Sequence, residues 1–291
     1  MTGHLIHVGY PKAGSTYLQR WFASHPQLAY VEGGIAGYRN VYEVAPEAAS
    51  PRPAAPLWRV TSTEGLIAPA KALGRWSAEP KYGGMAEVER ACSSLAELFP
   101  GATVLIVTRG FRSMILSSYS QYVRSGGTRS LEALMRHERG ADHPWNYDAA
   151  IGHYRARFGA ANVIVLPYEL LRDSPADFVG ALAARLGLDP AAVPDGRVNP
   201  SLAPAELAWY PRLAGAARAL PLVGARAHRL LARAAFNNRL RRPIAALQRL
   251  LPRPPVTDAM IDDDLIATFR GYAGRLRDEP LYATYADAYL F

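Results

Sequence analysis

The chain has 291 residues and 49% hydrophobic content, enough for one large α/β domain or for a domain with an appendage. A single cysteine, Cys92, excludes an intrachain disulfide and fits a reducing compartment, while the net charge of +8 favours an anionic partner. Only four residues precede the first predicted strand and no apolar run reaches membrane-spanning length, so we expect a cytoplasmic protein without signal peptide or membrane anchor.

The first predicted strand, at residues 5–8, leads through a glycine-bearing loop into a helix. In a strand, loop and helix of this kind, backbone N–H groups and the helix dipole converge on a phosphate. Gly9 and Gly14 permit backbone conformations that a side chain would forbid. Ser15 and Thr16 supply hydroxyl donors and are expected to cap the helix.

The loop differs from that of a nucleotide hydrolase, in which a lysine follows the second glycine. Here Ser15 takes that place and the lysine, Lys12, lies inside the loop. A hydrolase also needs an acidic residue at the end of a second buried strand to hold Mg²⁺. The best candidate strand, at residues 103–108, is followed by Arg109 instead. We therefore expect a site for an anionic nucleotide without a metal.

The remaining pattern alternates strands with helices, which predicts an α/β fold with a doubly wound parallel sheet. Residues 33–57 are expected to form a long loop near an acceptor site. We assign residues 1–200 to the α/β core and residues 201–291 to a helical extension packed on the same domain. Further strands are predicted at 28–31, 57–62 and 162–166, and helices at 85–98, 111–125, 130–137, 147–158 and 175–186.

The part beyond residue 200 is helical and rich in arginine, and its prolines are expected to break the helices. Between Leu207 and Thr257 it has no acidic residue, which leaves all 25 acidic residues and 23 of the 33 basic ones to the rest of the chain. The segment is either a solvated helical face or a surface for an anionic acceptor, a carrier or a membrane, with no specific nucleic acid expected. Its ten arginines are at positions 212, 218, 226, 229, 233, 239, 241, 242, 249 and 253.

Three stretches together resemble sulfotransferases that use 3′-phosphoadenosine 5′-phosphosulfate (PAPS). PKAGST and the helix after it resemble their 5′-phosphosulfate loop, and VLIVTRGFRSMILSSYSQY resembles their 3′-phosphate segment. VIVLPYELLRDSP resembles a later strand of the family, with its Tyr-Glu-x-Leu and Asp-x-Pro run. The matches come in family order over residues 4–190, and VTSTEGL, SYSQYVRSGG and VNPSL look most like bacterial members.

The resemblance implies a P-loop-like fold and a PAPS donor site without a metal. Arg109 and Ser117 would hold the 3′-phosphate, unless they only form a solvated helix start. Tyr168 would pack on the adenine, unless it is a plain core aromatic. The family's late basic-glycine motif has no clean counterpart, so Arg239, Arg241 and Arg242 are only candidates for a third contact. The predicted donor-binding residues are Pro11, Lys12, Ala13, Gly14, Ser15, Thr16, Tyr17, Arg109, Ser117, Tyr168 and Arg241.

The resemblance also implies a catalytic pair. Lys12 would stabilise the leaving phosphate, unless it is an ordinary turn lysine. Glu64 follows the strand that delivers the family's base, although it would also serve as a helix cap; Glu32, soon after His25-Pro26, is the second choice. The implied activity is sulfuryl transfer to a hydroxyl or amine of a small-molecule, glycan or lipid acceptor. The alternatives are a P-loop-type nucleotide kinase or NTPase with a degenerate loop, and a protein that binds anionic surfaces.

Overall fold

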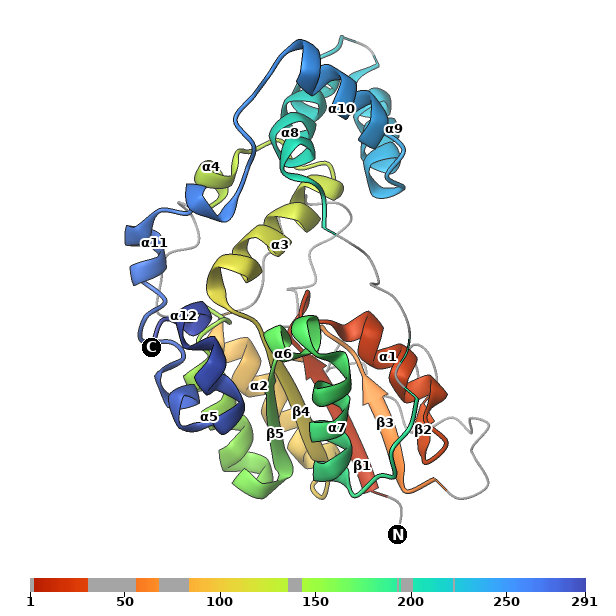
Figure 1. Ribbon diagram of the computed structural model, residues 1–291, viewed down its shortest axis with the longest axis vertical. Coiled ribbons are helices and arrows are strands. Elements are labelled where there is room, and N and C mark those ends of the chain that lie inside the picture. The colour runs from red at the N-terminus through yellow and green to blue at the C-terminus, as the bar shows by residue number, and fades with distance from the viewer. Residues whose placement is uncertain are drawn as a thin grey trace.

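The computed structural model describes residues 3–30, 56–67, 84–135, 143–192, 194, 201–221 and 223–291. Within these residues, five parallel strands form one sheet in the order β2-β3-β1-β4-β5 (Figure 1). The predicted α/β fold with a doubly wound parallel sheet is confirmed. The strands are β1 (Gly3–Gly9), β2 (Leu28–Tyr30), β3 (Trp58–Ser62), β4 (Thr103–Thr108) and β5 (Val163–Pro167).

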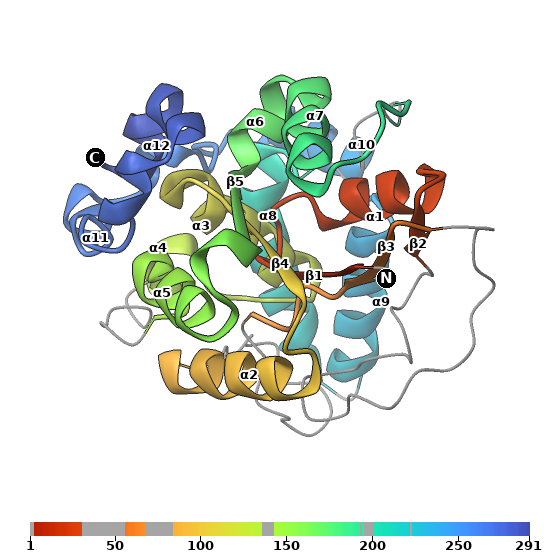
Figure 2. The same cartoon turned by 90° about the horizontal axis from the view of Figure 1, so that it is seen from below.

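Continuous apolar runs explain why the central strands are parallel and covered on both faces. Leu5, Ile6 and Val8 of β1 are buried, as are all residues from Val104 to Thr108 of β4. Figure 2 shows one helix layer on each side of the sheet. On one side lie α1 (Ser15–Ser24), α6 (Tyr168–Asp173) and α7 (Pro175–Leu186), and on the other lie α2 (Met85–Leu98) and α5 (Tyr147–Phe158).

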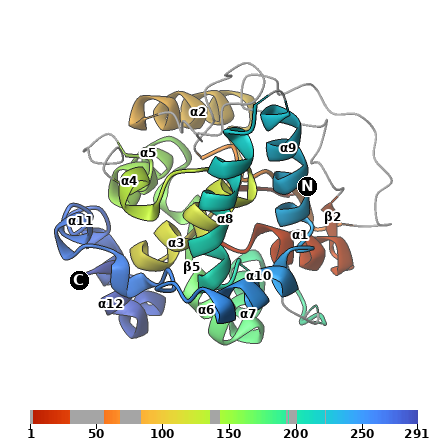
Figure 3. The same cartoon turned by 90° about the horizontal axis from the view of Figure 1, so that it is seen from above.

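Helix α3 (Phe111–Arg124) leads from the end of β4 away from the sheet. It contacts α8 (Pro204–Arg218) and α9 (Gly224–Phe236), and α10 (Arg241–Leu250) contacts α8; we call α8, α9 and α10 the helical cap. Figures 1 and 3 show the cap above the end of the sheet at which the strands finish. The short helix α4 (Leu131–Met135) follows α3.

The last part of the chain returns from the cap to the α/β core. It comprises α11 (Asp263–Ala267), α12 (Ala286–Tyr289) and the 3-10 helices η3 (Asp258–Met260), η4 (Gly274–Asp278) and η5 (Pro280–Tyr285); the 3-10 helix η2 (Ala160–Asn162) precedes β5. Contacts join η5 to β5 and α12 to α3. Tyr282 and Tyr289 are fully buried there, so this segment adds aromatic packing beside the sheet.

Some prolines separate the cap helices as the sequence predicted, since Pro221 lies between α8 and α9 and Pro252 follows α10, but three others lie within helices. Pro204 begins α8 and Pro243 lies in the first turn of α10, where a missing N–H is tolerated. Pro211 lies inside α8, where proline removes a hydrogen bond and costs about 3 kcal/mol. Burial of the neighbouring Trp209 and Tyr210 offsets this cost, because tertiary packing overrides local propensity.

Candidate functional site

The loop between β1 and α1 has a backbone that only particular residues can adopt. Gly9, Lys12 and Gly14 have φ of 123°, 66° and 87°, all in the left-handed region. A Cβ at Gly14 would lie 2.3 Å from Leu171 Cδ2, and one at Gly9 would lie 2.9 Å from the Glu64 carbonyl oxygen. The loop is therefore held between the turn after β3 and helix α6, with no room for larger residues.

The first turn of α1 leaves its backbone donors facing the loop. The N-cap is Gly14, with no side-chain cap bond, so the predicted capping role of Ser15 and Thr16 is wrong. Both residues are instead the first two of the helix, because the left-handed Gly14 already turns the chain into it. Among the described residues, the amides of Gly14, Ser15 and Thr16 donate to no backbone carbonyl. Uncapped amides at a helix N-terminus attract an anion.

Four candidate residues follow four adjacent strands at one edge of the sheet. Glu64 comes after β3, Lys12 after β1, Arg109 after β4 and Tyr168 after β5, and these strands are neighbours in that order. Strand order reverses beside β1, where open α/β sheets bind their ligands. The structure thus places together four residues that are far apart in the sequence.

Lys12 is half-buried among charged groups. Burial lowers its pKa from the usual value, the Glu64 carboxylate opposes this shift, and the positive charges of Arg124 and Arg109 add to it. Two cationic side chains and one carboxylate therefore act on the Lys12 ammonium. A dianion placed there would relieve the repulsion between the cations.

Arg109 is fixed from three sides. Its Nη1 donates to the Lys12 carbonyl oxygen at 2.5 Å and its Nε donates to Ser113 Oγ at 2.9 Å. Its guanidinium lies 4.3 Å from the centre of the Tyr168 ring, and Tyr168 also packs beside Gly14. Arg109 therefore ties the end of β4 to the loop after β1.

Beneath Arg109 lies a buried carboxylate that sequence reasoning missed. Glu169 is 2% exposed; its Oε1 accepts from the Gly110 amide at 3.0 Å and its Oε2 accepts from the Tyr289 hydroxyl at 2.8 Å. The Ser113 hydroxyl lies 3.4 Å from Oε1, so Ser113 connects Glu169 with Arg109. Arg109 precedes α3 and Ser113 lies in its first turn, so no helix-face spacing in the sequence indicates the role of Glu169.

The neighbouring Arg112 is held by other partners. Its Nη1 donates to the Ile261 carbonyl oxygen at 3.0 Å and its Nη2 lies 2.5 Å from Asp263 Oδ1. Arg112 thus joins α3 to the C-terminal segment, and Arg109 alone of this pair lies against the loop.

The other predicted donor contacts are less directly placed. Ser117 is buried on α3, two turns beyond Arg109. Arg241 is exposed at the start of α10 in the helical cap. Glu32 lies outside the described residues. Ala13 is buried, and Pro11 and Tyr17 are half-buried in and after the loop.

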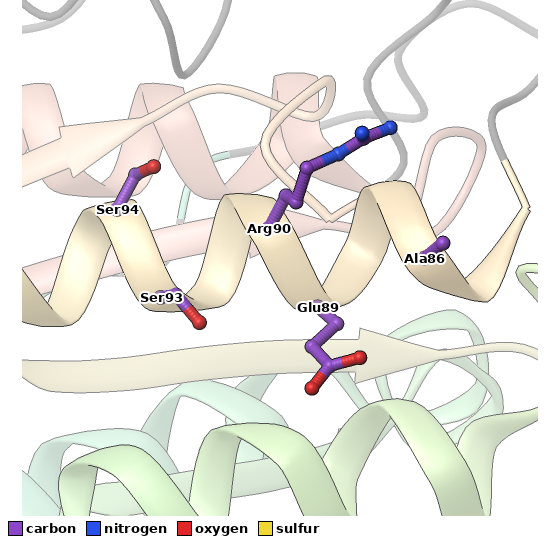
Figure 4. Close-up of a pocket in the computed structure, with 5 residues that line it drawn as sticks. All are labelled: Ala86, Glu89, Arg90, Ser93 and Ser94. Carbon is purple, nitrogen blue, oxygen red and sulfur yellow. The ribbon is translucent and has the colours of Figure 1, made fainter.

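A surface hollow elsewhere lies on the outer face of α2 (Figure 4). It is lined by Ala86, Glu89, Arg90, Ser93 and Ser94, all from that one helix. The strand ends contribute nothing to this hollow, so we do not assign it to the site. In the described part of the chain, no cluster of His, Cys, Asp or Glu has the arrangement of a metal site. No helix in that part is both long and apolar enough to cross a membrane.

Comparison with known proteins finds a family model that matches part of this site. A model of the sulfotransferase family matches residues 84–192, which include Arg109, Ser117 and Tyr168 but not the loop of Lys12. The resemblance to sulfotransferases is confirmed by this match. The sequence matches none of the curated proteins with which it was compared.

Two solved structures are similar to the chain. A sulfotransferase from Alicyclobacillus acidocaldarius is 18% identical, with 69% of this chain and 87% of that chain covered and a TM-score of 0.46. Mouse sulfotransferase SULT7A1, complexed with PAP, is 13% identical, with 73% of this chain and 63% of that chain covered and a TM-score of 0.39.

Proposed function

We propose that the protein transfers a sulfuryl group from PAPS to a hydroxyl or amine of an acceptor. The observation that carries the proposal is the contact between Arg109 and the Lys12 carbonyl oxygen, which brings two cationic residues to adjacent strand ends. A donor with phosphates at its 3′ and 5′ positions has two anionic ends, and this pair offers one cation to each. The match to the sulfotransferase family over residues 84–192 supports the same reaction class.

The proposed reaction is a single in-line displacement. The acceptor oxygen or nitrogen attacks the sulfur, and the bond between sulfur and the bridging oxygen of the 5′-phosphate breaks. Negative charge develops on that oxygen, where the Lys12 ammonium and the amides of Gly14, Ser15 and Thr16 would be most favourable. The Glu64 carboxylate, whose charge acts on Lys12, would take the acceptor's proton, and adenosine 3′,5′-bisphosphate would leave.

The Arg109 side of the site would distinguish PAPS from ATP. ATP has no 3′-phosphate, and its hydrolases hold Mg²⁺ with an acidic residue at a strand end. In this chain Arg109 follows β4 at that place. The buried free thiol of Cys92 is compatible with a reducing compartment, and we propose that the enzyme acts in the cytoplasm.

Donor choice and transfer can be tested separately. Calorimetry should show binding of adenosine 3′,5′-bisphosphate without Mg²⁺, and binding of ATP with Mg²⁺ alone would contradict the proposal. Incubation with PAPS and a fractionated host extract, followed by mass spectrometry, should reveal an acceptor with added sulfate. Lys12→Ala should abolish this product. The control Arg20→Ala removes an exposed cation of α1, the helix after the loop, and should leave the product unchanged.

The role of Glu64 requires its own variant. Glu64→Gln keeps the size of the side chain but cannot take a proton at neutral pH, so transfer should fall about a hundredfold or more. Affinity for adenosine 3′,5′-bisphosphate should stay within about twofold of the native value, since the base contacts the acceptor rather than the donor. Unchanged turnover would exclude Glu64 as the base and make Glu32 the next residue to replace.

A further inference from the structure

The helical cap concentrates the positive charge of the chain. All ten arginines between residues 212 and 253 are exposed, and none forms an ion pair within the described part of the chain. The nearest acidic residues in sequence are Glu206, which is buried, and Asp258, beyond the cap. The cap therefore presents positive charge without internal compensation.

The same part of the chain exposes large apolar side chains. Ten such residues are exposed in the described parts of the structure, and six of them lie between residues 220 and 251. Phe236 is 62% exposed and Leu250 is 78% exposed. The full set is Leu220, Val223, Leu230, Phe236, Leu250 and Leu251. Single exposed apolar residues are ordinary, but such a concentration on a cationic surface indicates a binding surface.

Helix α9 shows how the two kinds of side chain are combined. Its exposed positions follow helical spacing, so they share one outward face, while Ala235 is buried against the rest of the protein. This outward face contains Arg226, Arg229, Leu230, Arg233 and Phe236. Cations and apolar groups thus alternate along one line instead of occupying opposite faces.

A bilayer surface containing anionic lipids fits both features. Its phosphates attract arginines, and the boundary below them accepts leucine and phenylalanine side chains. Arginine can keep its charged end among headgroups while its stem lies along apolar neighbours. A nucleic acid would use the arginines but would leave the exposed leucines in water. We propose that the outward face of the helical cap, α9 and α10 with their flanking turns, docks on an anionic membrane surface.

The test is flotation of the full-length protein with lipid vesicles. Vesicles of phosphatidylcholine with about one-third phosphatidylglycerol should bind the protein, and pure phosphatidylcholine vesicles should bind it far less. The triple variant Arg226→Gln, Arg229→Gln, Arg233→Gln should bind the anionic vesicles about a hundredfold more weakly, since each cation near such a surface contributes about fivefold. Raising the salt concentration should also weaken binding of the native protein.

A matched variant separates position from net charge. Arg20→Gln, Arg157→Gln, Arg185→Gln removes three exposed arginines from α1, α5 and α7 and should bind vesicles as the native protein does. If both triple variants lost the same amount of vesicle affinity, net charge alone would explain the binding and the proposal would be overturned. Circular dichroism and nucleotide binding check that each variant is folded.

The apolar residues provide the second decisive test. Phe236→Ser with Leu250→Ser keeps every charge and should weaken vesicle binding about tenfold or more, because two apolar side chains no longer enter the boundary. Unchanged vesicle binding by this variant would refute insertion. Binding of duplex DNA or RNA with higher affinity than anionic vesicles at the same salt concentration would show a nucleic-acid surface instead and would overturn the proposal.

Discussion

The donor site can be tested with Arg109, which precedes α3, and Arg112, which lies in the first turn of that helix. Arg109 lies against the loop, with Nη1 at 2.5 Å from the Lys12 carbonyl oxygen, whereas Arg112 donates to the Ile261 carbonyl oxygen at 3.0 Å. Each substitution to alanine removes one charge from nearly the same place in the sequence. Only Arg109→Ala should affect the binding of a 3′-phosphate.

The expected size follows from the interaction that is lost. A hydrogen bond to a charged partner contributes about 1.5–3 kcal/mol, so Arg109→Ala should weaken binding of adenosine 3′,5′-bisphosphate about tenfold to a hundredfold. Adenosine 5′-phosphate lacks the 3′ group, and its affinity should change about threefold at most, through loosening of the loop. Arg112→Ala should leave both affinities within about twofold.

Isothermal calorimetry at one fixed salt concentration measures the affinities of the native protein and the two variants for both nucleotides. The informative quantity is the ratio between the two nucleotides for each protein, because a general loss of folding or charge affects both ligands together. If Arg109→Ala weakened both nucleotides equally, or if Arg112→Ala gave the larger loss for the bisphosphate, the assignment of the 3′-phosphate to Arg109 would be refuted.

Three further experiments test the packing around the site. Gly14→Ala should lower the free energy of unfolding by about 3 kcal/mol, because Gly14 has a left-handed backbone and Leu171 lies close to it. The double variant Gly14→Ala, Leu171→Ala should lose less stability in thermal unfolding than the sum of the losses of the two single variants. Burial lowers the pKa of His7 from 6.5 to about 4, so the free energy of unfolding should fall by roughly 3 kcal/mol as the pH drops from about 6.5 to 4. Urea titrations of His7→Asn should show a weaker dependence of stability on pH. Tyr289→Phe removes a donor to the buried Glu169 carboxylate and should lower the free energy of unfolding by about 2 kcal/mol, whereas an unchanged urea midpoint would exclude this role.

The sheet and most of its helices could be predicted because their signals are local. The apolar run at residues 103–108 and the helix from Pro175 to Leu186, ended by Gly187, occur where the sequence places them. The capping role given to Ser15 failed because the backbone of Gly14 already begins the helix. Pro211 failed as a helix breaker because packing in the cap is a tertiary property that no local pattern reports.

The site was predicted where its residues follow strand ends, and missed where it depends on distant contacts. Lys12 and Arg109 follow adjacent strands, so the sheet order brings them together. The roles of the predicted donor and catalytic residues stay predictions. The role of Glu169 was not predicted because its partner Tyr289 is 120 residues away, and no spacing rule connects the two.

The burial of Tyr282 and Tyr289 beside β4 has a consequence for the order of assembly. Thr108 Oγ1 lies 2.7 Å from the Tyr282 hydroxyl, across 174 residues of sequence, and Glu169 accepts from the Tyr289 hydroxyl across 120 residues. On the ribosome, the loop and both strands that flank Arg109 are synthesised well before these tyrosines. A nascent chain halted before residue 282 would therefore contain Lys12 and Arg109 and still lack the Tyr289 hydroxyl that supports Arg109 through Glu169 and Ser113, so capture of the donor is expected to await the synthesis of residues 282–289.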